Sequence, residues 1–175
     1  MRVYRTSPEG EEFTLEVVRE GTVFGEIAAF GPRRLRAAYA QAVEPSLVAS
    51  LRRGDLEDLI RRNPEVGIGL VNLLSERLRL CHNRMADFAN KDVQGRLASL
   101  ILYLVEGEGI ITAEGPKIPT RYTHERLGTM IGAGRVAVSR ALAKLREAGA
   151  VEQQRRRPIR VVDIEALERA AGVKR

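Results

Sequence analysis

The stretch THERLGTMIGAGRVAVSRALAKLREAGAV, residues 123–151, decides the fold of this chain. Its apolar residues recur three and four positions apart in two short segments, and glycines separate the segments. The pattern predicts two short helices joined by a tight turn, with a basic and polar face at the start of the second. This is the arrangement of a helix-turn-helix, whose second helix enters the major groove of DNA.

The ends of the two helices carry residues suited to those positions. The hydroxyl of Thr123 can accept a free backbone N–H of the first helix. Leu127 and Ile131 are four residues apart, so both can pack inward from one face. Gly132 permits a turn with positive φ, and Gly134 is a weaker cap for the second helix than serine would be.

The second helix separates apolar from polar residues. Its inner stripe is predicted to consist of Val138, Ala141, Leu142 and Leu145, and Gly149 is predicted to end the helix. The opposite face holds Arg135, Val136, Ser139, Arg140 and Lys144. The sequence therefore predicts a DNA-reading surface, although an amphipathic hairpin with a solvated charged face would show the same pattern.

A basic hairpin follows the two helices. Residues 150–154 and 159–162 read as short strands around Arg155, Arg156, Arg157 and Pro158, which makes a winged helix. The arginine run is either a DNA-contacting tip or a solubilising turn. The predicted DNA-binding residues are Thr123, His124, Arg135, Val136, Ser139, Arg140, Lys144, Arg155, Arg156 and Arg157. Among these, Arg135 and Arg140 suit guanine edges, Val136 a thymine methyl group, and Ser139 a base or a phosphate.

Charge is distributed unevenly along the 175 residues. Residues 1–90 hold 13 basic and 13 acidic side chains, whereas residues 91–175 hold 16 and 10, so the net charge of +6 belongs to the second half. An excess placed beside a helix-turn-helix is expected for phosphate contact, and a weakly basic solvated surface is the alternative. The sequence shows no membrane span or signal peptide, and we expect a cytoplasmic protein.

Metal and redox chemistry find little support in the composition. The single cysteine, Cys81, cannot form an internal disulfide, and with only His82 and His124 beside it a metal site is not expected. Iron–sulfur clusters need several cysteines, and a lone histidine is a weak basis for haem binding. We find no nucleophile–base pair, carboxylate dyad or phosphate-binding loop, and therefore predict no enzymatic activity.

The first half of the chain reads as a β-lobe followed by helices. Strands are predicted at residues 1–6, 12–18, 36–43 and 47–50, with turns at 7–10 and 20–21 and a tight glycine-containing segment at 23–28. Helices are predicted at 54–62, 65–89, 93–105 and 163–171, a polar hinge at 90–92, and a strand-and-turn connection at 107–119.

The long helix has a heptad pattern. One set of positions holds Val71, Leu78 and Met85, and the other holds Leu74, Cys81 and Phe88. This alternating spacing is typical of a two-stranded coiled coil, so these six residues are the predicted dimerisation seam, with Cys81 a small seam residue. A single helix lying on its own β-lobe is the alternative.

This order of elements resembles the Crp/Fnr family, that of the cyclic-AMP receptor protein and the fumarate–nitrate regulator. The resemblance spans nearly the whole chain and is most specific at GTVFGE (21–26), DVQGRL (92–97) and residues 123–151. It implies an α+β fold with a partial double-stranded β-helix (jelly-roll) sensor lobe at 1–63, a dimerisation helix at 64–90 and a winged helix-turn-helix domain at 91–175. It also implies a homodimeric transcription regulator that binds a palindromic promoter site and acts with RNA polymerase.

The chain departs from the family in its first segment. Family lobes carry several strands before the position that matches Met1 here, so the chain starts inside the lobe. A start codon assigned late, a naturally shortened lobe and missing N-terminal residues all remain open. A partial barrel exposes sheet edges and part of its core.

The effector that the resemblance implies is ambiguous. The matching pocket residues are Gly25, Glu26, Arg36, Arg77, Cys81 and His82. Cyclic AMP would meet Ala37 in place of a phosphate-binding serine, and Cys81 and His82 in place of an adenine-contacting pair. Arg36 and Arg77 match two arginines that hold 2-oxoglutarate in the cyanobacterial nitrogen regulators, but His82 replaces a glutamate there. Cyclic AMP, 2-oxoglutarate and no effector at all stay open.

One alternative function remains from the sequence. A small-molecule sensor acting through protein partners, with a degenerate DNA-binding domain, would share this element order. Tight ligand binding without any preference among DNA duplexes would favour that alternative. The target genes, and whether the chain activates or represses them, do not follow from the sequence.

Overall fold

A computed structural model of the chain describes residues 1–31, 36, 38–153 and 158–173. The chain divides into two compact units, Met1–His82 and Asn83–Arg175. The long helix α3 (Pro64–Asn90) contains the boundary between them. We describe each unit by itself.

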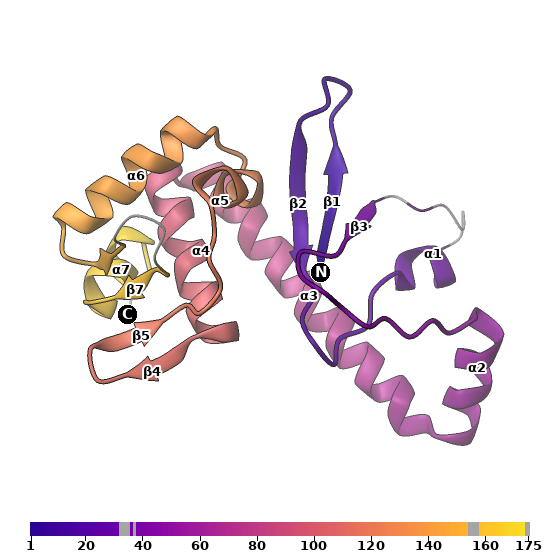
Figure 1. Ribbon diagram of the computed structural model, residues 1–175. Helices are drawn as coiled ribbons and strands as arrows, with labels where there is room; N and C mark the ends of the chain where they lie inside the picture. Colours follow the sequence, from indigo (N-terminus) through magenta and orange to yellow (C-terminus); the bar gives the residue numbers. More distant parts are fainter. Residues whose placement is uncertain (32–35, 37, 154–157, 174–175) are drawn as a thin grey trace. The chain divides into compact units, whose positions relative to one another are not determined.

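The first unit holds a small antiparallel sheet and three helices. Strands β1 (Arg2–Thr6), β2 (Glu12–Val17) and β3 (Tyr39–Gln41) pair in the order β2-β1-β3 (Figure 1). Helices α1 (Glu26–Phe30) and α2 (Arg53–Arg62) precede α3. The predicted turn at 7–10 is confirmed, because the amide of Gly10 donates to the carbonyl of Ser7 at 3.0 Å and Gly10 has a φ of 86°.

Two strand predictions in this unit need correction. The strand expected at 36–43 is paired only over β3, and residues 47–50 form no strand. The physical reason is a missing partner: every residue from 42 to 55 is exposed, and Leu47 is as accessible as in an extended chain. A run of suitable residues becomes a strand only where a neighbouring strand completes its backbone hydrogen bonds. Helix α1 was not expected; it is too short to show periodicity.

The second unit packs helices against one another and against a small sheet. Its helices are α4 (Val93–Glu108), α5 (His124–Ile131), α6 (Arg135–Glu147) and α7 (Ile164–Ala170). Its strands β4 (Ile110–Thr112), β5 (Gly115–Lys117), β6 (Val151–Glu152) and β7 (Arg160–Val161) form a sheet in the order β4-β5-β7-β6 (Figure 1). The core includes Leu97, Ile101, Leu104, Leu127, Val138, Leu145 and Leu167, all fully buried.

The predicted ends of the helix-turn-helix are confirmed, whereas α4 continues to Glu108, beyond the predicted end at residue 105. The hydroxyl of Thr123 accepts from the amide of Arg126 at 3.1 Å, and Gly132 ends α5 with a φ of 61°. After α6 the chain turns at Gly149, whose φ is 70°, and the amide of Ala150 returns to the carbonyl of Leu145 at 3.0 Å. Asp163 caps α7 by accepting from the amide of Ala166. These local signals fix both ends of α5, the end of α6 and the start of α7.

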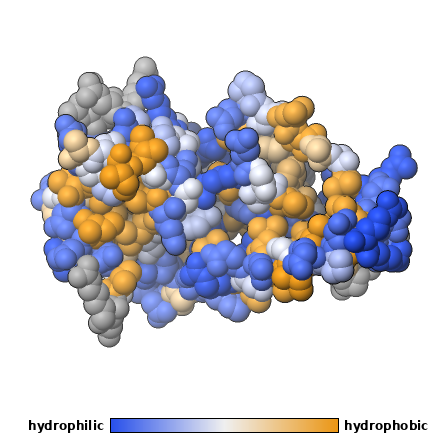
Figure 2. Space-filling model, turned by 90° about the horizontal axis from the view of Figure 1, so that it is seen from below, coloured by the Kyte–Doolittle hydropathy of each residue, from blue (hydrophilic) through white to orange (hydrophobic). Residues whose placement is uncertain are grey.

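Helix α3 differs from the other long helix in its burial. None of its residues is buried, whereas α4 buries six. The large side chains left exposed on α3 are Ile68, Val71, Leu74, Leu78, Met85 and Phe88. Figure 2 shows that orange apolar patches interrupt the blue polar surface on the face it draws. In the part of the chain that the structure describes, no helix has the length and apolarity of a membrane span.

Candidate nucleic-acid interface

Helix α6 presents two contrasting faces. Its inner face packs into the core through the four apolar residues expected there, Val138, Ala141, Leu142 and Leu145, which are all buried. On the outer face Arg135, Arg140 and Lys144 are exposed, and Ser139 is half-buried. Val136, which is also on this outer face, is 64% exposed. The outer face therefore carries the residue types that read bases and phosphates.

The basic side chains of this face have no acidic partner among the described residues. Several arginines elsewhere pair with carboxylates, as Arg53 does with Glu57 at 2.6 Å and Arg79 with Glu76 at 2.5 Å. No ion pair in the described part of the chain involves Arg135, Arg140 or Lys144. These charges are therefore available to an external anion.

The start of α6 adds to the positive character of this face. Gly134 is its N-cap and offers no side chain to accept the free amides of the first turn. Arg135, the first helical residue, lies at the positive end of the helix dipole, where an arginine is unfavourable for folding by itself. A free N-terminus and a cation together suit a phosphate oxygen.

Gly128 fixes the approach of the two helices and was missed by the sequence reasoning. A Cβ placed on it would lie 2.3 Å from the carbonyl oxygen of Ala133 and 3.6 Å from Cγ2 of Val138. The amide of Ala133 also donates to the carbonyl of Gly128 at 3.0 Å. A glycine inside a helical pattern is the signal that could have found it, because such a glycine often marks close packing.

Two of the predicted DNA-binding residues contact each other. Nδ1 of His124, at the start of α5, lies 2.6 Å from Oγ of Ser139 on α6, and the contact is partly buried. The sequence reasoning placed each residue separately against DNA. The structure brings them together as one hydrogen-bonded pair across the helix-turn-helix.

Arg96 on α4 ties the hinge to the helix-turn-helix. Its Nε donates to the carbonyl of Ile131 at 3.0 Å, and its Nη1 donates to the carbonyl of Lys91 at 3.0 Å. The guanidinium also lies 5.1 Å from the ring centre of Phe88. One side chain thus joins the C-terminus of α5 to the end of α3, both within the second unit. Sequence reasoning did not single out this residue.

A carboxylate holds the segment that leads into α5. Glu108, at the end of α4, accepts from the hydroxyl of Thr120 at 2.5 Å and from the hydroxyl of Tyr122 at 2.5 Å. Tyr122 is buried and directly precedes the capping residue Thr123. The position of the first helix of the motif is therefore fixed from both ends.

The strands of the wing are tied together by ion pairs. Arg160 on β7 contacts Glu152 on β6 and Glu114 in the β4–β5 turn. The hydrogen bond that Arg160 donates to Glu152 is the main cause that raises the pKa of Arg160 above its usual value, and the charge of Glu114 adds to it. The predicted tip residues Arg155, Arg156 and Arg157 lie outside the described residues. Arg160, in contrast, forms its ion pairs with carboxylates of the protein itself.

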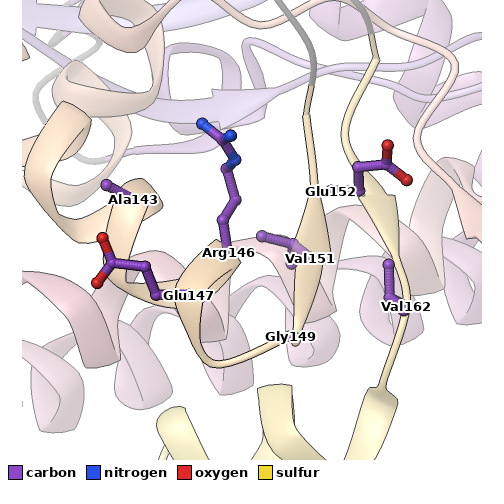
Figure 3. Close-up of a pocket in the computed structure, with 7 residues that line it drawn as sticks. All are labelled: Ala143, Arg146, Glu147, Gly149, Val151, Glu152 and Val162. Carbon is purple, nitrogen blue, oxygen red and sulfur yellow. The ribbon is translucent and has the colours of Figure 1, made fainter.

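A surface depression of about 480 Å³ lies between the end of α6 and the wing strands. Figure 3 shows Arg146 and Glu147 on the helical side of this depression, and Glu152 and Val162 on the strand side. Its lining combines charged side chains, from Arg146, Glu147 and Glu152, with apolar ones. It bears no predicted DNA-binding residue.

In the first unit, Arg77 is surrounded by carboxylates of its own lobe. Its Nη2 lies 2.9 Å from Oε1 of Glu16 on β2, and its Nη1 lies 3.0 Å from Oε2 of Glu26 on α1. Nη2 also donates to the carbonyl of Val23 at 2.6 Å. The Arg77 side chain is only 15% exposed. Two negative charges thus surround one positive charge at this position.

The other predicted effector residues are not joined to this cluster. Gly25 is the N-cap of α1 with a φ of 90°. Arg36, Cys81 and His82 are exposed, and no hydrogen bond or ion pair given for the described residues connects them to Glu26. Of the six residues, the structure brings together only Glu26 and Arg77. The described residues contain no group of three or more potential metal ligands.

The predicted seam residues lie exposed along α3. Val71, Leu74, Leu78, Met85 and Phe88 are 40–68% exposed, and Cys81 is exposed as well. The first unit also has a shallow depression of about 310 Å³ at the start of α3, lined by Gly21, Thr22, Val23, Val66, Gly69, Leu70 and Leu73. None of the seam residues lines it.

Comparison with known proteins gives two family matches that together cover most of the chain. Residues 1–63 match a cyclic nucleotide-binding domain, and residues 95–170 match a Crp-like helix-turn-helix domain. Among curated proteins, the chain is 29% identical over 171 residues to a CRP-like cAMP-activated global transcriptional regulator of Mycobacterium tuberculosis, covering 98% of this chain and 75% of that protein. It is 34% identical over 151 residues to the cyclic AMP receptor protein of Thermus thermophilus, covering 86% of this chain and 66% of that protein.

Solved structures share the fold. A CooA mutant from Carboxydothermus hydrogenoformans matches with a TM-score of 0.81 and 22% identity, over 97% of this chain and 74% of that one. A CRP/FNR-family transcriptional regulator of Thermus thermophilus matches with a TM-score of 0.74 and 24% identity, over 99% and 84%. The element order of this chain is therefore that of these proteins.

Proposed function

Since the chain belongs to the Crp/Fnr family of DNA-binding transcription regulators, we propose that it binds a palindromic duplex as a homodimer with α6 in the major groove. The half-sites of such a duplex lie about one helical turn apart. We further infer that the bound dimer acts on RNA polymerase in the cytoplasm, because its relatives are bacterial transcription regulators. Membership of the family supports the class of function, and the residues of α6 and α3 support the proposed mode of binding.

The observation that carries this proposal is the set of basic side chains without acidic partners on α6. Several arginines of the first unit, among them Arg53 and Arg77, and Arg160 in the wing pair with carboxylates, whereas Arg135, Arg140 and Lys144 stand together on one exposed helix face without such partners among the described residues. A surface kept positive in this way favours phosphate and base contacts.

We assign the base-reading role to the first two turns of α6. Arg135 and Arg140 would form bidentate hydrogen bonds with guanine, and the exposed Val136 would contact a thymine methyl group. Lys144 and Thr123 would contact the backbone and add affinity without sequence preference. The run Arg155 to Arg157 is proposed as a further backbone contact on the grounds of sequence alone.

We assign dimerisation to the exposed heptad stripe of α3. An apolar stripe with three- and four-residue spacing and no buried member is expected to pack against a second copy of itself. The symmetry of such a pair would match the symmetry of a palindrome. The alternative, a helix packed on its own lobe, predicts burial of the stripe, and these side chains are exposed.

We propose that Arg77 holds the lobe together and is not an anion receptor in this conformation. Several relatives are named cAMP-activated regulators, and others are named global nitrogen regulators. An anionic ligand at Arg77 would have to displace Glu16 and Glu26, whose charges oppose its approach. DNA binding without added cyclic AMP or 2-oxoglutarate is the expected behaviour of this chain.

Binding measurements on variants of α6 test the proposal. The purified chain is titrated onto a labelled duplex selected from a random pool, and affinity is measured at several salt concentrations. Arg135→Ala is expected to relax base preference at one position, whereas Lys144→Ala is expected to weaken all duplexes alike and reduce the salt slope by about one. Equal loss on every duplex for Arg135→Ala would contradict its reading role.

A further inference from the structure

The contact between His124 and Ser139 joins the two helices of the motif at its DNA-facing end. His124 is the first residue of α5 and Ser139 is the fifth of α6, and their Nδ1 and Oγ atoms are 2.6 Å apart. The turn between the helices is short, and across it the backbones of Gly128 and Ala133 are closely packed and hydrogen bonded. The two side chains are therefore held facing each other.

We propose that Ser139 is a positioning residue that orients the imidazole of His124 toward a DNA phosphate, and that it does not read a base. This inference rests on the proposed binding of DNA through α6. The sequence predicted one DNA contact for His124 and another for Ser139; in this proposal the two residues act as one hydrogen-bonded pair. Only His124 in this pair then touches the nucleic acid.

The direction of the hydrogen bond depends on which ring nitrogen carries the hydrogen. In a neutral ring one nitrogen donates and the other accepts. When the Ser139 hydroxyl donates to Nδ1, the ring hydrogen lies on Nε2, which points away from Ser139 on the opposite side of the ring. In the protonated ring Nδ1–H donates to Oγ and Nε2 still carries a hydrogen. With Ser139 as the donor to the neutral ring, as the proposal requires, the outward atom is a donor in either charge state, whereas a neutral ring with its hydrogen on Nδ1 would leave Nε2 as an acceptor.

The position of His124 suits a phosphate acceptor. It follows the capping residue Thr123 and stands at the positive end of α5, where the helix dipole favours an anion. Hydrogen bonds to phosphate oxygens fix the register of a protein on DNA without reading sequence. An outward Nε2–H at this place provides such a bond.

The pairing also limits what Ser139 can do. A hydroxyl has one hydrogen, and in the neutral pair His124 uses it. Ser139 then has no hydrogen left to donate to a phosphate or to an acceptor on a guanine or thymine edge. Base preference is left to the unpaired side chains of α6, Arg135, Val136 and Arg140.

NMR of the free chain tests the pair without DNA. The nitrogen shifts of the two histidine rings are recorded at pH 8, where histidine side chains are ordinarily neutral, and His82→Gln identifies the signals of His124. We expect the ring hydrogen of His124 on Nε2. We also expect the Nδ1 chemical shift of a nitrogen that accepts a hydrogen bond, which Ser139→Ala should remove and Ser139→Thr should retain. A ring with its hydrogen on Nδ1, or signals unchanged by Ser139→Ala, would overturn the proposal.

A double-mutant cycle on the selected duplex tests the phosphate role. A hydrogen bond to a charged group supports a loss of about tenfold in affinity for His124→Ala. Ser139→Ala should lose nearly as much, the double variant little more, and Ser139→Thr should recover binding. Thr129→Ala is the matched control, since its hydroxyl donates within α5 to the carbonyl of Arg126 at 2.9 Å; it should bind like the unmodified chain.

Base preference separates the outcomes. Selection from a random pool with Ser139→Ala should return the same consensus as the unmodified chain, at lower affinity. Additive losses in the cycle, or a changed base at one position of the consensus, would refute the positioning role. An unmodified chain that selects no duplex overturns the proposed DNA binding and with it the phosphate role, even where the NMR spectra show the pair.

Discussion

Replacing Gly128 with alanine should loosen the helix-turn-helix, although alanine is the better helix former. The added Cβ would lie 2.3 Å from the carbonyl oxygen of Ala133, whereas ordinary contacts begin near 3.4 Å. The turn must therefore open by about 1.1 Å, the difference between these two distances. Both atoms belong to the backbone or are rigidly attached to it, so no rotamer change can relieve the overlap.

The two opposing effects have comparable sizes. Overpacking a tight site typically costs about 1–3 kcal/mol, and the rigid neighbour places Gly128→Ala near the upper end. The higher helix propensity of alanine returns about 1 kcal/mol. The net loss in the free energy of unfolding is then about 2 kcal/mol, which for a domain of this size lowers the melting temperature by roughly 8–16 °C.

Calorimetry and hydrogen exchange together give the assay. Calorimetry of the full chain measures the melting of both units, and exchange at the amides of Ala133 and Val138 reports whether opening starts at the turn. Gly69→Ala on α3 is the matched control, because a Cβ there meets no atom within 4 Å. It should raise stability by up to about 1 kcal/mol. If Gly128→Ala also stabilised the chain, the steric reasoning would be refuted.

Three further changes test other parts of the structure. Arg77→Met leaves Glu16 and Glu26 without their shared cation and should destabilise the first unit by about 1–3 kcal/mol in thermal unfolding; an unchanged melting temperature would show that the cluster contributes nothing. Leu78→Glu places a charge in the proposed dimer seam and should give monomers in sedimentation equilibrium, whereas the same change at the off-seam Asn72 should leave dimers. Arg96→Met removes two hydrogen bonds to carbonyls and should lower DNA affinity about five- to tenfold, as fluorescence anisotropy of a labelled duplex can measure; undiminished binding would argue against a coupling role.

Sequence reasoning succeeded where the signal is local. Thr123, Gly132 and Gly149 each satisfy a backbone requirement of their own helix end, and such requirements can be read from neighbouring residues. The inward stripe of α6 follows from helical spacing in the same way. The winged helix-turn-helix could therefore be predicted without a structure.

Sequence reasoning failed where the outcome depends on partners far along the chain. Arg77 was matched to a ligand-binding arginine, yet its main partner Glu16 lies 61 residues away on β2. His124 and Ser139 were assigned separately because their approach depends on the packing of two helices. The expected strand at 47–50 lacked a neighbour to pair with. In each case the missing information was a tertiary contact.

Selection of random duplexes by the purified full chain, without added effector, tests the central claim most directly. The account predicts a palindromic consensus with half-sites about one helical turn apart. It also predicts that the guanine assigned to Arg135 loses its enrichment when Arg135→Ala is used instead. A pool that stays random with the unmodified chain, or a consensus that Arg135→Ala leaves unchanged, would contradict the account.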